Sequence, residues 1–113
     1  MTMIAKGPQC VTLINVFTVE PAKQRRLVDL LIRATEATMK HLPGFISANI
    51  HKSLDGTRVT NYAQWRSVED FQAMLKSPKA IPHMQEAAAL ASSFDPVLYE
   101  VVEVCTLDSS HSA

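Results

Sequence analysis

Two segments of alternating polar and apolar residues, 45–53 and 57–65, lie on either side of the dipeptide Asp55-Gly56. An Asp-Gly pair in this setting is one of the strongest short-range signals of an antiparallel β-hairpin, because glycine accepts the positive φ that a tight turn requires. We therefore expect a hairpin in the middle of the chain. The remaining elements have to be arranged around it.

Before the hairpin, residues 10–19 predict a strand, since they alternate and are rich in β-branched side chains. Residues 20–42 repeat apolar side chains at helical spacing, which predicts one long amphipathic helix that begins near Pro21. The dipeptide Pro43-Gly44 should end this helix.

After the hairpin, Ser67 and Asp70 have the spacing of a capping box and predict the start of a second helix. The segment 77–80 interrupts this helix, and an Ala-rich helical piece follows over residues 81–94. Residues 95–105 predict the final strand.

The order strand, helix, strand, strand, helix, strand predicts an α+β fold, the ferredoxin-like βαββαβ arrangement with an antiparallel four-stranded sheet. The length of 113 residues suits a single domain, which we expect over residues 10–106. We expect residues 1–9 to be a flexible lead-in and residues 107–113 to be a disordered tail.

The first and last predicted strands are apolar on both faces, although helices can cover only one face of such a sheet. In the first strand, for example, Leu13 and Phe17 fall on one face and Ile14 and Val16 on the other. An uncovered apolar face is unfavourable in water. We therefore expect a homodimer in which two sheets pack together around a twofold axis.

Composition excludes several classes of protein. The net charge is zero, with no long basic segment, so we expect no nucleic-acid partner. No apolar stretch is long enough to span a membrane, and the first residues do not resemble a signal peptide, so we expect a cytoplasmic protein. Cys10 and Cys105 could lie close together on neighbouring strands, but a cytoplasmic chain favours free thiols. The histidines and cysteines have no metal-ligand spacing.

Two asparagines and the single tryptophan fall at positions where apolar residues are expected. Asn61 and Trp65 share one face of their strand with Val59 and Ala63, and Asn15 lies among apolar residues of the first strand. A buried amide needs a hydrogen-bond partner. That partner is either the neighbouring backbone, with the tryptophan filling the core, or a bound ligand.

The segment "DGTRVTNYAQWRS" at 55–67, supported by "LPGF" at 42–45, resembles the antibiotic biosynthesis monooxygenase family of dimeric α+β barrel proteins. The resemblance covers about residues 11–104 and is closest to the quinone-forming members. It implies that a phenolic or polycyclic aromatic substrate, polyketide-like or a hydroquinone, is oxidised to a quinone. It also implies O₂ as co-substrate, with no metal, flavin or haem. By this resemblance Asn61 and Trp65 are the catalytic residues and donate hydrogen bonds to substrate oxygens in a pocket between the helices and the sheet.

The resemblance also suggests second-tier substrate-binding residues, namely Asn15, Phe71, His83 and Gln85. Phe71 replaces a pocket tyrosine of the family and Gln85 replaces a pocket arginine. His83 could act as a base or a hydrogen-bond donor near neutral pH.

Two alternatives remain. The same fold occurs in non-enzymatic small-molecule-binding and stress-response proteins, and fold alone does not fix function. Haem-degrading monooxygenases of this fold also resemble the chain, with Asn15 and His83 at two of their functional positions, the latter as haem ligand. Met74 stands where those enzymes have a functional tryptophan, which counts against this second alternative.

Overall fold

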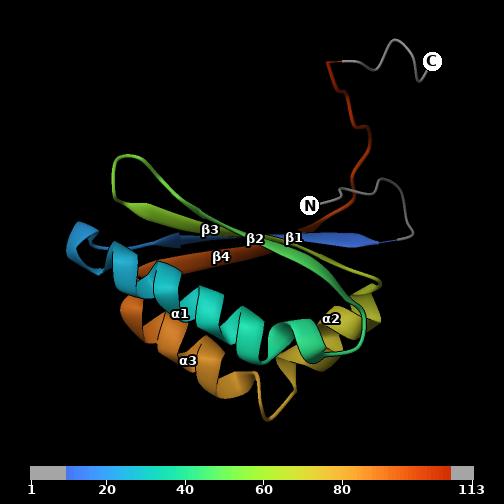
Figure 1. Cartoon of the computed structure of the whole chain (residues 1–113), viewed down its shortest axis with the longest axis horizontal. Helices are drawn as coiled ribbons and strands as arrows, with labels where there is room; N and C mark the ends of the chain where they lie inside the picture. Colours follow the sequence, from blue (N-terminus) through green and yellow to red (C-terminus); the bar gives the residue numbers. More distant parts are fainter. Residues whose placement is uncertain (1–9, 108–113) are drawn as a thin grey trace.

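The structure is a computed structural model that describes residues 10–107. The predicted lead-in at 1–9 and all but the first residue of the predicted tail lie outside the described residues. Its four strands, β1 (Val11–Thr18), β2 (Phe45–Lys52), β3 (Arg58–Trp65) and β4 (Ser93–Tyr99), form one sheet in the order β2-β3-β1-β4. All three neighbouring pairs are antiparallel, so the predicted ferredoxin-like α+β fold is confirmed (Figure 1).

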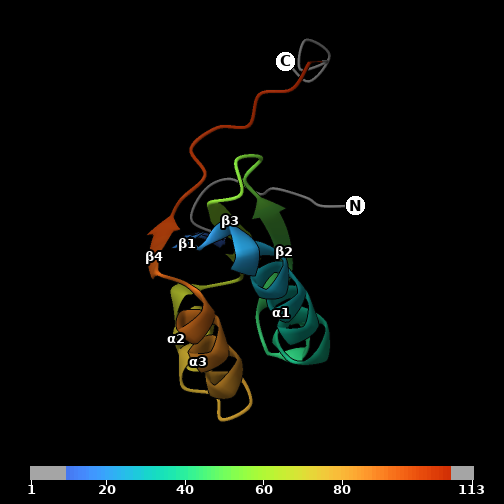
Figure 2. The same cartoon turned by 90° about the vertical axis from the view of Figure 1, so that its left-hand side faces the viewer.

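The helices cover one face of the sheet. They are α1 (Gln24–Ala37), α2 (Val68–Leu75) and α3 (Ile81–Leu90), with short 3-10 turns η1 (Pro21–Lys23) and η2 (Met39–His41) before and after α1. Figure 2 shows α1 on one side of this layer and α2 and α3 on the other.

The prediction of one continuous helix over 20–42 was wrong. The backbone leaves helical geometry at Thr38, where φ is −132° and ψ is −62°. The amide N–H of Thr38 still donates to the carbonyl of Ala34, at 3.0 Å, which closes the last turn of α1. A β-branched threonine is a weak helix former, and here its hydroxyl has a partner on another helix, as described below.

The hairpin and the second helix start form as predicted. Gly56 has a φ of +84° in the turn between β2 and β3. The Asp55 carboxylate accepts hydrogen bonds from the hydroxyl of Ser53 and from the amide and hydroxyl of Thr57, at 2.7 to 3.0 Å. At the start of α2, Ser67 Oγ accepts a hydrogen bond from the amide of Asp70 at 3.1 Å.

The last strand was predicted over 95–105 but occupies 93–99, so α3 ends earlier than its predicted end at 94. Residues 100–107 have no regular hydrogen-bonded structure and leave the sheet on the side away from the helices (Figure 1). The register explains this difference. Thr12, near the start of β1, pairs with Tyr99, so the chain beyond Tyr99 has almost no β1 left to pair with.

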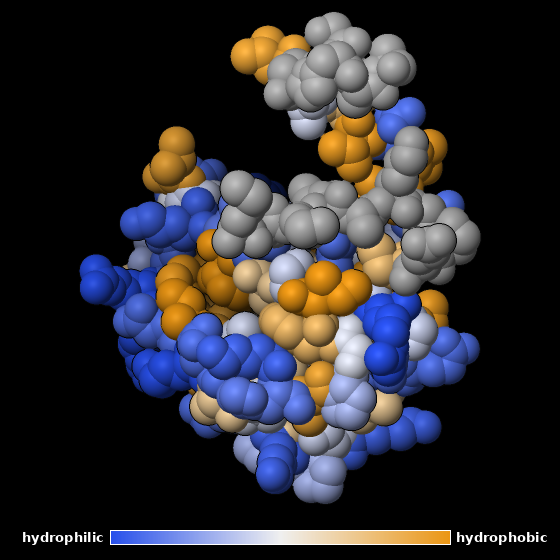
Figure 3. Space-filling model, turned by 45° about the vertical axis from the view of Figure 1, so that its right-hand side comes forward, coloured by the Kyte–Doolittle hydropathy of each residue, from blue (hydrophilic) through white to orange (hydrophobic). Residues whose placement is uncertain are grey.

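Two clusters of buried side chains fill the space between helices and sheet. One lies around Trp65, and the other lies around Leu27 at the opposite end of the sheet. The helix-free face retains exposed apolar side chains, including Val97 and Tyr99, which are 38% and 48% exposed. Figure 3 views the molecule from the side and shows apolar residues gathered near the middle of that side, with hydrophilic residues around them.

Cys10 is buried and Cys105 is exposed, and no disulfide joins them. Within residues 10–107, no helix is long and apolar enough to cross a membrane. The cytoplasmic location and the homodimer stay predictions at this point.

Candidate active site

A cavity of about 210 Å³ lies between the helix layer and the middle of the sheet. On the sheet side, the cavity is left unfilled because Ala48 and Ala63, which are Cα partners on β2 and β3, both have small side chains. On the helix side, Ala34 of α1 and Ala87 of α3 also line the cavity with small side chains. The Ala-rich sequence of α3 is therefore part of what leaves this space open.

Asn15 and Asn61 lie directly opposite each other, as Cα partners on β1 and β3, and both line the cavity. The register thus places Asn15 on the face of the helices. Its Oδ1 accepts a hydrogen bond from the backbone amide of Asp95 on β4, at 3.2 Å. Asn15 therefore has a backbone partner, which is the first of the two alternatives given for a buried amide in the sequence analysis.

Trp65 is 2% exposed and ends β3 at the α2 side of the cavity. Its ring packs edge-on against Phe45 at a centroid distance of 5.5 Å and against Phe71 at 6.5 Å. Edge-to-face packing of this kind is favourable and fixes the direction of the indole. Phe71 therefore contributes an aromatic wall that carries no hydroxyl.

Within residues 10–107, three buried side-chain polar atoms have no hydrogen-bond partner, and two of them belong to this cavity: Asn61 Oδ1 and Trp65 Nε1. The third is the hydroxyl of Ser47. An unpaired buried donor or acceptor costs about 1–3 kcal/mol, so native proteins rarely leave two of them in one wall. A ligand with a hydroxyl group that donates to Asn61 Oδ1 and an oxygen atom that accepts from Trp65 Nε1–H would satisfy both atoms.

His83 lies in the first turn of α3 and lines the same cavity. Its Nε2 is 3.1 Å from the hydroxyl of Thr38, at the point where α1 ends. This contact joins α1 to α3 across the helix layer. Thr38 was not predicted as a site residue, although a hydroxyl on the otherwise apolar helical stripe of residues 20–42 is a signal that could have indicated a polar partner.

The cavity thus brings together five of the six predicted site residues, but Gln85 is exposed and does not line the cavity. Phe71 and Met74 are buried at its α2 side. Thr35 of α1 also lines the cavity and was not predicted; its hydroxyl donates to the carbonyl of Leu31 at 2.8 Å.

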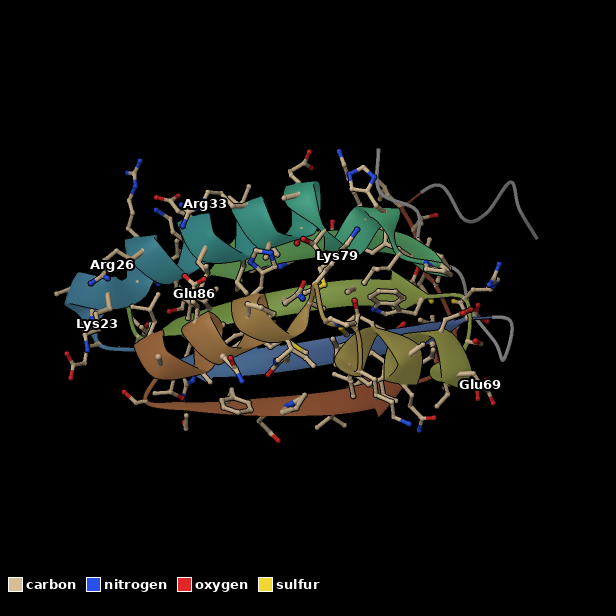
Figure 4. All side chains as sticks on the ribbon, turned by 90° about the horizontal axis from the view of Figure 1, so that it is seen from below. Lys23, Arg26, Arg33, Glu69, Lys79 and Glu86 are labelled. Carbon is tan, nitrogen blue, oxygen red and sulfur yellow. The ribbon has the colours of Figure 1, made fainter. Side chains whose placement is uncertain are left out.

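Among the described residues, no Asp, Glu, Lys or Arg lines the cavity. Figure 4 views the helix layer from the side away from the sheet, and its labelled charged residues lie on η1, the three helices and the turn before α3: Lys23, Arg26, Arg33, Glu69, Lys79 and Glu86. Two surface carboxyl groups have lowered pKa values. A hydrogen bond from Lys40 lowers the pKa of Glu36, and hydrogen bonds from Thr57 and Ser53 lower the pKa of Asp55 to about 2. Among residues 10–107, no group of three or more His, Cys, Asp or Glu side chains is placed to hold a metal ion.

Comparison with known proteins identifies the family. The sequence pattern of antibiotic biosynthesis monooxygenases matches residues 10–90. The chain is also 46% identical to tetracenomycin-F1 monooxygenase from Streptomyces glaucescens over 101 residues, or 89% of each chain. The chain belongs to the antibiotic biosynthesis monooxygenase family. The family resemblance stated from the sequence is therefore confirmed.

Solved structures of this family have the same fold. SnoaB from Streptomyces nogalater, described as a cofactor-independent oxygenase, is 25% identical, with a TM-score of 0.73 over 88% of this chain and 98% of that one. The ActVA-Orf6 monooxygenase of Streptomyces coelicolor, solved with nanaomycin D, is 28% identical, with a TM-score of 0.78 over 85% and 90%. These relatives confirm the prediction of a monooxygenase. The roles of individual residues stay predictions.

Proposed function

We propose that this monooxygenase oxidises a phenolic polycyclic aromatic molecule to a quinone with O₂ and without a resident cofactor. The observation that carries the proposal is the pair of unpartnered atoms, Asn61 Oδ1 and Trp65 Nε1, in the wall of an otherwise largely apolar cavity. The description of SnoaB as cofactor-independent and the ligand of ActVA-Orf6 support the same interpretation.

The size and lining of the cavity favour a flat aromatic ligand. An apolar cavity of about 150 Å³ is enough to bind benzene. The present cavity of about 210 Å³, lined by Phe45, Trp65 and Phe71, is larger than that. We infer that it accepts fused aromatic rings, with any additional ring extending toward the opening.

The reaction conserves atoms and electrons when a ring CH₂ of an anthrone becomes a carbonyl. The substrate loses four electrons and two hydrogens, one oxygen atom of O₂ enters the carbonyl, and the other leaves as water. The ionised substrate supplies the electrons. The Trp65 N–H is a neutral donor for a developing oxyanion or for reduced oxygen. The Asn61 amide can accept from a phenolic hydroxyl through Oδ1 or donate through its NH₂ group.

We also propose that two copies form a homodimer through the helix-free face of the sheet. Exposed Val97 and Tyr99 lie on this face, and the adjacent residues 100–107 include Val102, which is 84% exposed. A second sheet would cover this apolar surface. A monomeric mass by analytical ultracentrifugation at about 10 μM protein would contradict this proposal.

The experiment for the activity measures O₂ uptake and anthraquinone formation with anthrone and 1,8-dihydroxyanthrone as substrates. Chelator-treated protein is used, and the rate of spontaneous oxidation is subtracted. We expect Asn61→Ala and Trp65→Phe each to lower turnover by about 10- to 1000-fold; loss of one oxyanion donor costs about 100- to 1000-fold. Wild-type turnover that requires an added metal or flavin would contradict cofactor independence.

A matched control removes an amide outside the cavity. Gln72 is exposed on α2 and does not line the cavity, so Gln72→Ala should retain the wild-type rate. If Asn61→Ala is as active as Gln72→Ala, Asn61 has no part in the reaction. Saturable binding of the anthrones without any O₂ uptake would instead favour the alternative of a small-molecule-binding protein.

A further inference from the structure

The wall of the cavity contains a single ionisable side chain among the described residues, and it is His83. The other polar lining residues are the two asparagines, Thr35 and Trp65, none of which can take up a proton near neutral pH. A substrate that donates electrons to O₂ as an anion first has to lose a proton. His83 is therefore the one described group in the cavity wall that can receive it.

The contact with Thr38 fixes which ring nitrogen of His83 is free. Nε2 is held 3.1 Å from Thr38 Oγ1, and among residues 10–107 no other hydrogen bond to the ring is formed. A threonine hydroxyl can accept from an imidazole N–H. When Nε2–H donates to Thr38, the lone pair of the neutral imidazole is on Nδ1, which is left for a ligand.

We propose that His83 is the general base that deprotonates the substrate, and that Thr38 is a positioning residue that holds its ring. The inference rests on the proposed function. The end of α1 at Thr38 contributes to this arrangement. Thr38 follows the last residue of α1, and its hydroxyl contacts His83 in the first turn of α3.

The proton transfer is balanced as follows. The substrate O–H or ring C–H bond breaks, its electron pair stays on the substrate, and the proton binds Nδ1. The imidazolium then donates from both nitrogens, to Thr38 and to the substrate anion. After the anion has reacted with O₂, His83 returns its proton to the terminal peroxide oxygen. The remaining C–H bond then breaks and its electron pair forms the carbonyl, while the O–O bond breaks and the released proton joins the hydroxide that leaves as water. The residue therefore ends each turnover in its starting state.

The test compares wild-type protein with His83→Gln on a series of substituted anthrones of different acidity, at one fixed pH. Glutamine keeps a donor for Thr38 but cannot serve as a base. We expect His83→Gln to be at least about 100-fold slower on anthrones that are neutral at the assay pH. The difference should shrink to about twofold for anthrones that are already ionised, because these need no base.

Two further variants separate positioning from structure. Thr38→Val removes the hydroxyl and should lower the rate on neutral anthrones by roughly tenfold, while Thr38→Ser should restore it. His41→Gln is the matched control, because His41 is an exposed histidine outside the cavity. If His83→Gln does not fold, His83→Asn gives the same comparison.

The outcomes distinguish the two proposals. A deficit of His83→Gln that is equal for neutral and ionised anthrones, or no deficit, overturns the assignment of the base while the monooxygenase activity stands. Absence of wild-type turnover on every anthrone overturns the proposed function and this inference together. A deficit confined to neutral anthrones supports the inference.

Discussion

Replacing Asn61 by leucine should make the protein more stable and less active. Asn61 Oδ1 is buried without a partner, which costs about 1–3 kcal/mol. Leucine has a similar size and no polar atom, so it removes this cost and adds apolar contact with the surrounding wall. We expect the free energy of unfolding to rise by about 1–2 kcal/mol, or about 5 °C or more in Tm for a domain of this length.

The assay pairs thermal unfolding with O₂ uptake on anthrone, at equal protein concentrations. Turnover of Asn61→Leu should fall by at least about tenfold while Tm rises. Asn15→Leu is the matched control, because Asn15 lies opposite Asn61 in the same cavity but has a partner in the amide of Asp95. That substitution removes a hydrogen bond, and we expect it to lower the stability by about 0.5–1.5 kcal/mol.

The reasoning is refuted if Asn61→Leu lowers Tm as much as Asn15→Leu. That result would mean that Asn61 is satisfied in the free protein, and that its amide has a structural role. Equal turnover of Asn61→Leu and the wild type would separately exclude a catalytic role.

Three other predictions concern the scaffold and the cofactor. Gly44→Ala should cost about 2–4 kcal/mol by chemical denaturation, because Gly44 has a φ of +84° and an added Cβ would meet Asp70; Gly56→Ala, with the same φ but its nearest atom 3.6 Å away, should cost only about 1–2 kcal/mol, and equal losses would contradict this difference. Asp55→Asn should lower Tm at pH 7. The folded pKa of Asp55 lies near 2, below its ordinary 3.8, so its contribution is present above pH 3.8 and is lost as pH falls toward 2, where variant and wild type should converge. Hemin titration should show no saturable Soret shift, since Met74 stands where the resemblance to haem-degrading enzymes implies a functional tryptophan; a shift that His83→Ala abolishes would favour the haem alternative.

The hairpin and the start of α2 could be predicted because their signals are local. Asp55-Gly56 sets the hairpin, and the side chain of Ser67 caps α2 as its spacing indicates. Both depend on residues at most a few positions apart, so no knowledge of the tertiary structure is needed. The register between β1 and β3 is different, because it decides whether Asn15 faces the helices, and no local signal specifies it.

The errors at helix and strand ends have tertiary causes. Thr38 continues the helical stripe in the sequence, but its hydroxyl contacts His83, 45 positions later, and α1 ends there. Residues 101–105 have the composition of a strand, but a strand needs a neighbour, and β1 begins too late to pair with them. The apolar composition of this segment is understandable if the neighbour belongs to a second copy of the chain.

Helical geometry explains why one of two nearby polar residues joins the site and the other does not. His83 and Gln85 are two positions apart, which places their side chains about 200° apart around an α-helix. One of them can face the cavity only if the other faces solvent, and the structure places His83 in the wall and Gln85 outside. The resemblance stated from the sequence implies that Gln85 replaces a pocket arginine, so under the proposed function the charge of a substrate anion has to be balanced from elsewhere. In the proposed mechanism, His83 takes up the proton of the substrate and becomes a positively charged imidazolium beside the anion. This positive charge is therefore present only after the anion has formed.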